Sequence, residues 1–227
     1  MPNLLAIVPM RHNSERVKGK NYRLFGGKPL YRHIVDTLLA CDAVGQVVID
    51  TDSPTIMDDA RATYGERVML YTRPPHLRDG STPMNDVLLN TTAHFNADFY
   101  LQTHSTNPLL RASTLADALA RFFAVYPQYD SMFAVTRLQV RLWDALARPV
   151  NHNPNILLRT QDLPPIYAEN SNFYVFTRET LLRRHNRVGD RPLMIDVPAL
   201  EAWDIDEEGD FAVAETIYHT HHTPKGE

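Results

Sequence analysis

Short apolar runs alternate with segments in which apolar residues recur at helical spacing. The runs are bounded by proline or polar residues, which is typical of strands buried in a parallel sheet. They predict strands at 4–8, 46–49, 67–71, 98–102, 131–136 and 169–176. Helical spacing predicts helices at 29–41, from about 54, at 83–94, from 111, and at 210–220. This alternation predicts an α/β fold of the Rossmann-like type, a mostly parallel sheet flanked by helices.

The pattern weakens between residues 137 and 169. Prolines stand at 149, 154, 164 and 165, with asparagine and histidine between them. The stretch therefore predicts a small insertion into a core formed by 1–136 and 170–227, rather than a hinge. A chain of 227 residues, 44% of them hydrophobic, has room for one sizeable core and a small appendage.

Composition narrows the function classes. The net charge of −4 gives no general nucleic-acid-binding character. Cys41 is the only cysteine, which excludes an internal disulfide and a cysteine-based zinc site. No apolar run reaches the roughly 18 residues of a membrane span, and the N-terminus lacks the features of a signal peptide. We expect a cytoplasmic enzyme with no membrane partner.

A basic segment follows the first predicted strand. Between Arg11 and Arg23 there are five basic residues and one acidic residue, Glu15, together with the Ser14 hydroxyl and Gly19. Open α/β sheets bind ligands at the carboxyl ends of their strands. Polyphosphates are held by cations, hydroxyls and closely approaching backbone N–H groups, so the segment predicts a polyphosphate site. A solvated basic loop is the alternative.

Two acidic residues stand near the other end of the chain, in Asp204-Ile205-Asp206. In an extended chain, residues two apart point the same way, so both carboxylates can reach one point. They would repel each other without a cation, and Mg²⁺ suits all-oxygen ligands with phosphate oxygens and water completing its shell. Asp-x-Asp also occurs in solvated turns, so the pair alone leaves both interpretations open.

The order of residues in the basic segment is similar to that of a loop in a known protein family. Val8-Pro9-Met10-Arg11, Ser14 and Gly19-Lys20-Asn21, followed by 26–30, resemble the loop of the acylneuraminate cytidylyltransferase family. That family includes the CMP-sialic acid synthetases and is related to the CMP-KDO synthetases. The resemblance implies that this loop wraps the triphosphate of CTP.

The resemblance also implies individual roles. Arg11 and Lys20 would hold phosphates, Ser14 would donate to them, and Asn21 would lie beside the nucleotide. His12-Asn13-Ser14-Glu15 departs from the family's usual Gly-Gly-Ser-Lys, and we expect Glu15 to face solvent because it would repel a triphosphate.

Two further segments resemble the family. Residues 72–82 resemble the segment that lies against cytosine and ribose, which implies nucleotide contacts from Arg73 and Ser81, with Asp79 as a secondary candidate. Residues 102–111 resemble the segment near the acceptor sugar, which implies contacts from Gln102 and Ser105. This second segment is longer than usual and lacks the acidic metal ligand of CMP-KDO synthetases, which favours the nonulosonate branch.

The predicted insertion resembles the family's dimerisation element, which reaches the neighbouring subunit's site. Within it, Arg159 is the best candidate for the sugar carboxylate, with Arg137 and Arg141 as alternatives, because guanidinium pairs bidentately with carboxylate. Asn170 would contact the sugar, and the next residue is serine where the family has glycine.

The resemblance implies a CTP-dependent nucleotidyltransferase that activates a nonulosonic, sialic-acid-like sugar acid and forms a homodimer. Arg11, Lys20, Asp204 and Asp206 would be catalytic, and the two aspartates would hold Mg²⁺. The alternatives are a related nucleotidyltransferase using another sugar or nucleotide, and a non-catalytic binding homologue.

Overall fold

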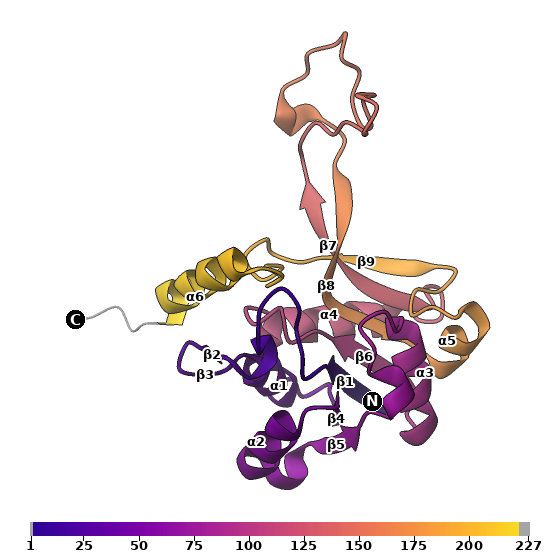
Figure 1. The fold of residues 1–227 in the computed structure, drawn as a ribbon. Helices are drawn as coiled ribbons and strands as arrows, with labels where there is room; N and C mark the ends of the chain where they lie inside the picture. The colour runs from indigo at the N-terminus through magenta and orange to yellow at the C-terminus, as the bar shows by residue number, and fades with distance from the viewer. Residues whose placement is uncertain (1, 223–227) are drawn as a thin grey trace.

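A seven-stranded sheet runs through the computed structural model, which describes residues 2–222, with side chains described up to residue 220 (Figure 1). The strand order is β5-β4-β1-β6-β8-β7-β9. The strands are β1 Leu4–Met10, β4 Gln46–Thr51, β5 Met69–Thr72, β6 Phe99–Thr103, β7 Ser131–Leu138, β8 Ile166–Phe176 and β9 Pro192–Asp196. A separate two-stranded ribbon is formed by β2 Leu24–Phe25 and β3 Lys28–Pro29.

The sheet is mostly parallel, as predicted. β1 pairs in parallel with β4 and β6, β4 with β5, and β7 with β9. Among the described strands of this sheet, β8 alone runs antiparallel to its neighbours β6 and β7. Every residue of β1 is buried, so the basic segment begins at the centre of the sheet.

Six helices accompany the sheet in the described part of the chain. They are α1 Leu30–Leu39, α2 Pro54–Tyr64, α3 Met84–His94, α4 Ala112–Val125, α5 Arg178–Arg184 and α6 Glu208–His222. Ser53 caps α2 by accepting from the Ile56 N–H. The apolar pattern did not predict α5 and β9, because both are short.

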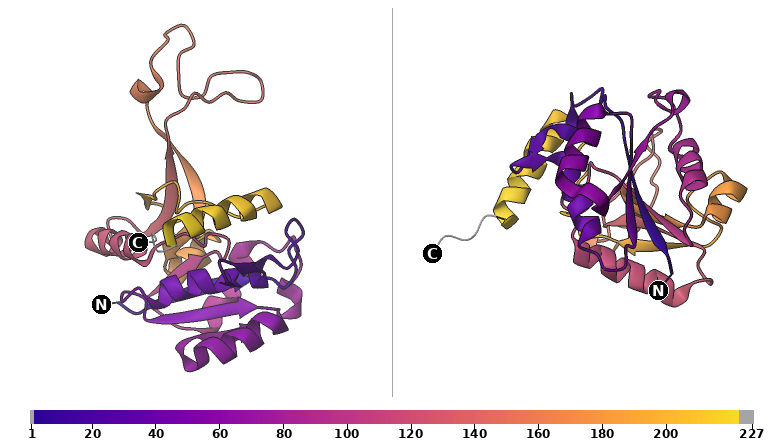
Figure 2. Two further views of the ribbon diagram at one scale, coloured as in Figure 1. Left: turned by 90° about the vertical axis from the view of Figure 1, so that its left-hand side faces the viewer. Right: turned by 90° about the horizontal axis from the view of Figure 1, so that it is seen from below.

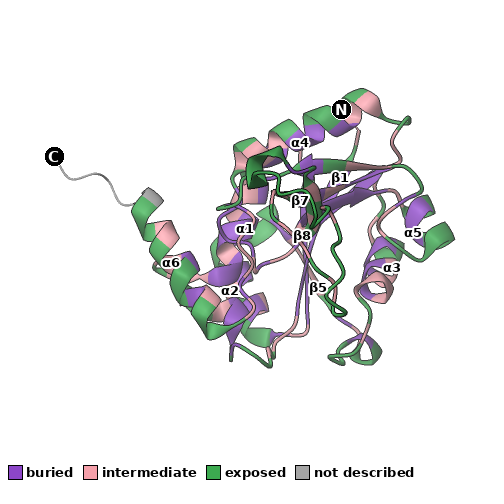
Figure 3. Ribbon diagram, turned by 90° about the horizontal axis from the view of Figure 1, so that it is seen from above, coloured by how far each residue is buried: buried purple, intermediate pink, exposed green. Residues whose placement is uncertain are grey.

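The two faces of the sheet bury separate cores. Alternate residues of β1 pack with α1, α2 and α4 on one face and with α3 and α5 on the other. In Figure 3 the buried sides of these helices face the sheet and exposed residues lie outward. None of the described helices is both long and apolar enough to cross a bilayer.

A third apolar cluster joins the two ends of the chain. Val17 and Phe25, from the N-terminal segment, pack against Ile205, Phe211 and Ala214. Figure 2 shows α6, in yellow, beside the indigo N-terminal segment. This packing brings the Asp204–Asp206 stretch to the basic segment, 180 residues away along the chain.

Residues 139–165 leave the sheet as an arm between β7 and β8 (Figures 1 and 2). The strands themselves run a few residues into the 137–169 insertion predicted from sequence. The arm exposes large apolar side chains, with Leu157 88% exposed and Leu146 71% exposed. Exposed apolar groups at this density are unusual on a free surface.

Candidate active site

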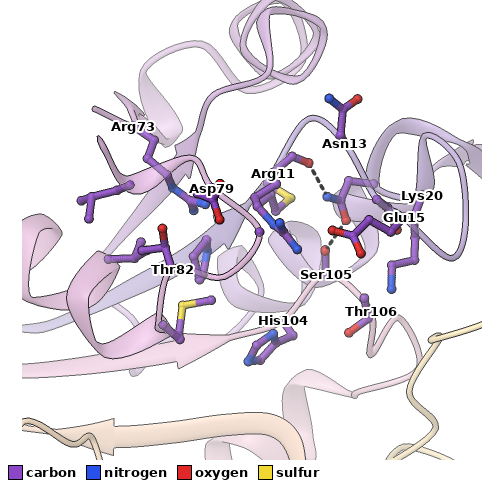
Figure 4. Close-up of a pocket in the computed structure, with 18 of the residues that line it drawn as sticks. Arg11, Asn13, Glu15, Lys20, Arg73, Asp79, Thr82, His104, Ser105 and Thr106 are labelled. Atoms are coloured by element: carbon purple, nitrogen blue, oxygen red, sulfur yellow. Dashed lines mark hydrogen bonds between the residues drawn. The ribbon is translucent and has the colours of Figure 1, made fainter. Parts of the chain in front are cut away.

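A cavity of about 400 Å³ opens at the carboxyl end of β1 (Figure 4). Its walls come from four stretches: the end of β1 with the basic segment, residues 73–82, the start of α3, and the turn after β6. The lining residues are Pro9, Met10, Arg11, Asn13, Ser14, Glu15, Arg16, Lys20, Asn21, Arg73, Leu77, Asp79, Gly80, Thr82, Met84, Val87, His104, Ser105 and Thr106.

Asn21 and Ser105 hold the basic segment in shape. Asn21 Nδ2 donates to the Arg11 carbonyl at 2.9 Å, and Ser105 Oγ donates to Asn21 Oδ1 at 2.7 Å. Gly19 turns the chain with a φ of 66°, a left-handed conformation that favours glycine. Both predicted contacts line the cavity, but their side chains already bond to each other (Figure 4).

His12 explains one departure from the expected glycines. Its N–H donates to Asp52 Oδ1 at 2.7 Å, and its Nδ1 lies 2.8 Å from Ser53 Oγ. The imidazole also stacks on Tyr22, with ring centroids 5.3 Å apart. The His12 imidazole therefore adds contacts to Ser53 and Tyr22 that glycine could not make, while the backbone bond to Asp52 does not depend on the side chain.

Glu15 stands at the rim of the cavity. Its side chain is exposed, in line with the expectation that it faces solvent, but it also lines the cavity beside Arg11. A Cβ added at Gly80 would lie 2.7 Å from Arg11 Nη1 and 2.9 Å from Glu15 Oε1. The absence of a side chain at Gly80 therefore lets residues 78–82 close on the basic segment.

Arg73 is part of a buried ion pair. The residue is 2% exposed, and its Nε donates to Asp50 Oδ1 at 2.8 Å while Nη2 donates to the Asp50 carbonyl at 3.1 Å. Asp50 is fully buried and also accepts from the Thr91 hydroxyl. Arg73 lines the cavity as predicted for a nucleotide contact, but two of its donors serve the fold.

Ser81, the other predicted contact of this segment, is not among the lining residues. Its N–H and hydroxyl both donate to Asp79 Oδ1, at 2.8 and 2.5 Å. These bonds lower the pKa of Asp79, which itself lines the cavity. The role of Ser81 in the structure is to orient Asp79.

Lys20 connects the basic segment to the acidic pair. Its Nζ donates to the Ile205 carbonyl at 2.5 Å and lies 3.9 Å from Asp206 Oδ1. Burial lowers the pKa of Lys20, and the nearby Asp206 and Asp204 partly offset that effect. Arg16 forms an exposed ion pair with Asp206 at 2.6 Å. The cations and carboxylates predicted from opposite ends of the chain therefore meet beside one cavity.

Asp204 has one carboxylate oxygen in use and one without a partner. Oδ2 accepts from Ser171 Oγ at 2.9 Å, whereas Oδ1 is buried and accepts no hydrogen bond. A buried carboxylate oxygen without a donor fits a cation ligand. Among the side chains that the structure describes, up to residue 220, no group of three or more His, Cys, Asp or Glu could hold a metal unaided. A cation on the two aspartates would therefore need oxygens from a ligand or water.

The residues predicted to contact the sugar do not gather around the cavity. Gln102 is fully buried, donates to the Thr103 carbonyl and accepts from Arg187 Nη1 at 2.6 Å. Asn170 Nδ2 donates to Thr136 Oγ1 at 3.0 Å. Neither lines the cavity, so of the predicted sugar contacts within the core only Ser105 does so.

Arg159 lies on the arm and its side chain is 73% exposed. Its Nε pairs with Asp162 Oδ2 at 2.7 Å. The alternative Arg141 donates to the Leu158 carbonyl, also on the arm. Because the arm extends away from the sheet (Figure 1), Arg159 does not line this chain's own cavity.

His104 is a lining residue that the sequence reasoning missed. Its Nε2 is buried without a hydrogen-bond partner (Figure 4). Burial lowers the pKa of His104 to about 3, with Arg187 and Lys20 adding to the effect, so the ring is neutral near pH 7. Its position directly after β6, a strand parallel to β1, was the available signal.

Comparisons with known proteins place the chain in a family. The family profile described as Cytidylyltransferase matches residues 5–218. The chain is 27% identical over 229 residues to the CMP-N,N'-diacetyllegionaminic acid synthase of Legionella pneumophila, covering 94% of this chain and 95% of that protein. It is 25% identical over 231 residues to a pseudaminic acid cytidylyltransferase of Campylobacter jejuni, covering 96% and 97%.

A vertebrate protein is also similar. N-acylneuraminate cytidylyltransferase A of Danio rerio is 25% identical over 221 residues, covering 94% of this chain, which spans only about half (50%) of that longer protein. Among solved structures, a CMP:2-keto-3-deoxy-manno-octonic acid synthetase complexed with CTP superposes with a TM-score of 0.70 at 15% identity, covering 96% of this chain and 99% of that one. At that identity the likeness concerns the fold.

Proposed function

The chain belongs to the cytidylyltransferase family, and we propose that it activates a nonulosonic, sialic-acid-like sugar acid with CTP. The products would be the CMP-sugar and pyrophosphate. Its relatives from Legionella pneumophila and Campylobacter jejuni are named for sugar acids of this class. The observation that carries the proposal is the approach of Lys20 to Asp206 at the edge of a cavity that Arg11 also lines.

The reaction needs charge neutralisation more than covalent chemistry. The anomeric hydroxyl attacks the α-phosphorus of CTP, a new P–O bond forms, and the bond to pyrophosphate breaks. Arg11 and Lys20 offset the charge that develops on the leaving pyrophosphate, and the Ser14 hydroxyl donates to it. Asn21, Ser105 and His12 keep these groups in place before the substrate arrives, which lowers the cost of orientation.

Asp204 and Asp206 would hold Mg²⁺. When bound, the ion neutralises phosphate charge and polarises the phosphoryl oxygens. The buried Oδ1 of Asp204 supports this assignment. Asp206 is paired with Arg16 near the surface, so the ion and Arg16 would compete for its carboxylate.

The acceptor is proposed to reach the cavity from the side of a second copy of the chain. Arg159 would pair with the sugar carboxylate in the partner's site, and the exposed apolar residues of the arm would be covered in a homodimer. Because the reaction consumes CTP, a cytoplasmic location is part of this proposal.

A substrate panel tests the reaction. The protein is incubated with Mg²⁺, each of four nucleoside triphosphates, and sialic, legionaminic, pseudaminic or KDO-type sugar acids, and pyrophosphate release is measured. Release with CTP and a nine-carbon sugar acid is expected. Release with UTP or GTP but not CTP would reject the proposal. Binding of CTP by calorimetry without turnover of any sugar acid would favour the non-catalytic alternative.

Mixing two inactive variants tests the role of the arm. Arg159→Ala and Asp204→Ala are each expected to lose activity. If Arg159 serves the partner's site, a mixed dimer keeps one intact site, and a random mixture recovers about a quarter of the wild-type rate. No recovery, with mixed dimers demonstrated by differential tags, would place Arg159 in its own subunit's site or outside the mechanism.

A further inference from the structure

The Asp204 carboxylate bonds to Ser171, and Asn107 lies against both Ser171 and the backbone beside Asp204. Ser171 Oγ lies 2.9 Å from Asp204 Oδ2 and 2.8 Å from Asn107 Oδ1. Asn107 is fully buried, so its side chain has little freedom to turn away. The three side chains come from β8, from the turn after β6 and from the segment before α6.

An irregularity in β8 directs Ser171 toward this point. β7 and β8 pair at Phe133–Tyr174 and again at Val135–Glu169, so residues 170–173 of β8 face a single residue of β7. Such bulges re-aim side chains and are common beside active sites. Within the bulge, Asn172 Nδ2 anchors the chain to the Glu201 carbonyl at 3.0 Å.

The acidic stretch is also held by its backbone. Asn107 Nδ2 donates to the Trp203 carbonyl at 3.3 Å, and the Ile205 N–H donates to the Thr106 carbonyl at 2.9 Å. Residues 106 and 107 therefore hold the chain on both sides of Asp204. What remains free is the rotation of the Asp204 side chain, and Ser171 restrains it.

The negative charge of the Asp204 carboxylate determines which acceptor receives the Ser171 proton. Ser171 has one proton and two acceptors within reach, and the ionised carboxylate is the stronger acceptor. Donation to Oδ2 leaves Oδ1, the buried oxygen without a partner, facing away from Ser171. A hydrogen bond to one carboxylate oxygen thus fixes which oxygen is available to a cation.

We propose that Ser171 is a positioning residue that presents Asp204 Oδ1 to a divalent cation, and that Asn107 assists by anchoring the Trp203 carbonyl beside Asp204. This inference rests on the proposed function, because it needs the cation to bind with the triphosphate. Ser171 makes no contact with the reacting atoms in this proposal.

The test uses the full-length protein with CTP and Mn²⁺, whose unbound fraction is measured by electron paramagnetic resonance. Ser171→Ala and Asn107→Ala are expected to weaken Mn²⁺ binding by about tenfold or more, the usual effect of losing a group that orients a metal ligand. Ser171→Thr keeps the hydroxyl and is expected to restore most of the affinity. In turnover assays, Ser171→Ala should require more Mg²⁺ while its KM for the sugar acid changes little.

Ser131→Ala is the matched control. Ser131 is a buried serine at the first residue of β7 and accepts from the Gly189 N–H at 2.8 Å. Its loss should change the melting temperature without changing Mn²⁺ affinity. Wild-type affinity in both Ser171→Ala and Asn107→Ala, or no rescue by Ser171→Thr, overturns the inference and leaves the proposed reaction intact. If the wild-type protein with CTP binds no Mn²⁺, the metal assignment and this inference fail together.

Discussion

Replacing Arg73 measures how much the buried ion pair between Arg73 and Asp50 contributes to the stability of the cavity wall. In Arg73→Met, the Asp50 carboxylate keeps the Thr91 hydroxyl but loses its cation. Both partners are almost inaccessible, with side chains 3% and 0% exposed, so water cannot replace the lost partner. Methionine fills similar volume, which confines the change mainly to charge and hydrogen bonding.

The expected loss of stability follows from that burial. Breaking a buried ion pair from one side lowers the free energy of unfolding by about 3–5 kcal/mol. The surviving bond from Thr91 favours the lower end of that range. At 2–4 °C per kcal/mol for a chain of this size, the melting temperature should fall by roughly 6–12 °C for a loss of about 3 kcal/mol.

The assay is urea denaturation without nucleotide, applied to Arg73→Met, Asp50→Asn and the double variant. The double variant should be more stable than the sum of the single effects predicts, by about 1–3 kcal/mol, because the second change removes a group already left unpaired. Arg61→Met is the control. Its ion pair with Asp58 is exposed, so its loss should stay below about 1 kcal/mol.

A result for Arg73→Met as small as that of Arg61→Met, with additive double-variant behaviour, would refute the reasoning. Arg73 would then be free to act chiefly on a nucleotide, and its loss would appear in CTP affinity. If Arg73→Met instead destabilises the protein as expected, part of any loss of CTP affinity in this variant comes from the destabilised cavity wall.

Three other predictions follow from the cavity. The pKa of His104 is about 3 in the folded chain and 6.5 when unperturbed, so the unfolded state binds more protons between these two pH values. The free energy of unfolding should therefore fall below pH 6.5 by up to about 1.4 kcal/mol per pH unit. His104→Asn should reduce this pH dependence in melting curves recorded at pH 5 and 7. An equal pH dependence of stability in the wild-type protein and in His104→Asn would contradict this role of His104. Gly80→Ala should weaken CTP binding in calorimetry several-fold with little loss of stability, because the new Cβ displaces the flexible end of Arg11. Gly209→Ala is the control: open space surrounds its Cβ, so CTP affinity should not change, while alanine in helix α6 should raise stability by up to about 1 kcal/mol. Lys20→Met should weaken CTP binding by about tenfold or more, since a buried ammonium is lost from the phosphate site, and unaltered affinity would remove Lys20 from the proposal.

The sequence was sufficient for the features that depend on local patterns. Hydrophobic runs located the central strands, because a strand buried on both faces must be apolar along its length. The basic segment and the Asp204–Asp206 pair were recognisable for a similar reason. Like charges concentrated in a few residues need a ligand or a counter-ion, wherever the chain places them.

Other features depended on contacts between residues far apart in the chain, which only the tertiary structure decides. The strand order brings β5, β4, β1 and β6 side by side, and so sets the pairing of Arg73 with Asp50 and of Ser105 with Asn21. The packing of α6 on the N-terminal segment brings Lys20 to Asp206. The residue type limits the partners with which a side chain can interact. Burial and the register of neighbouring strands determine which of these partners lies within reach. Arg11 and Arg73 therefore both line the cavity, but only the neighbouring buried Asp50 shows that Arg73 also serves the fold.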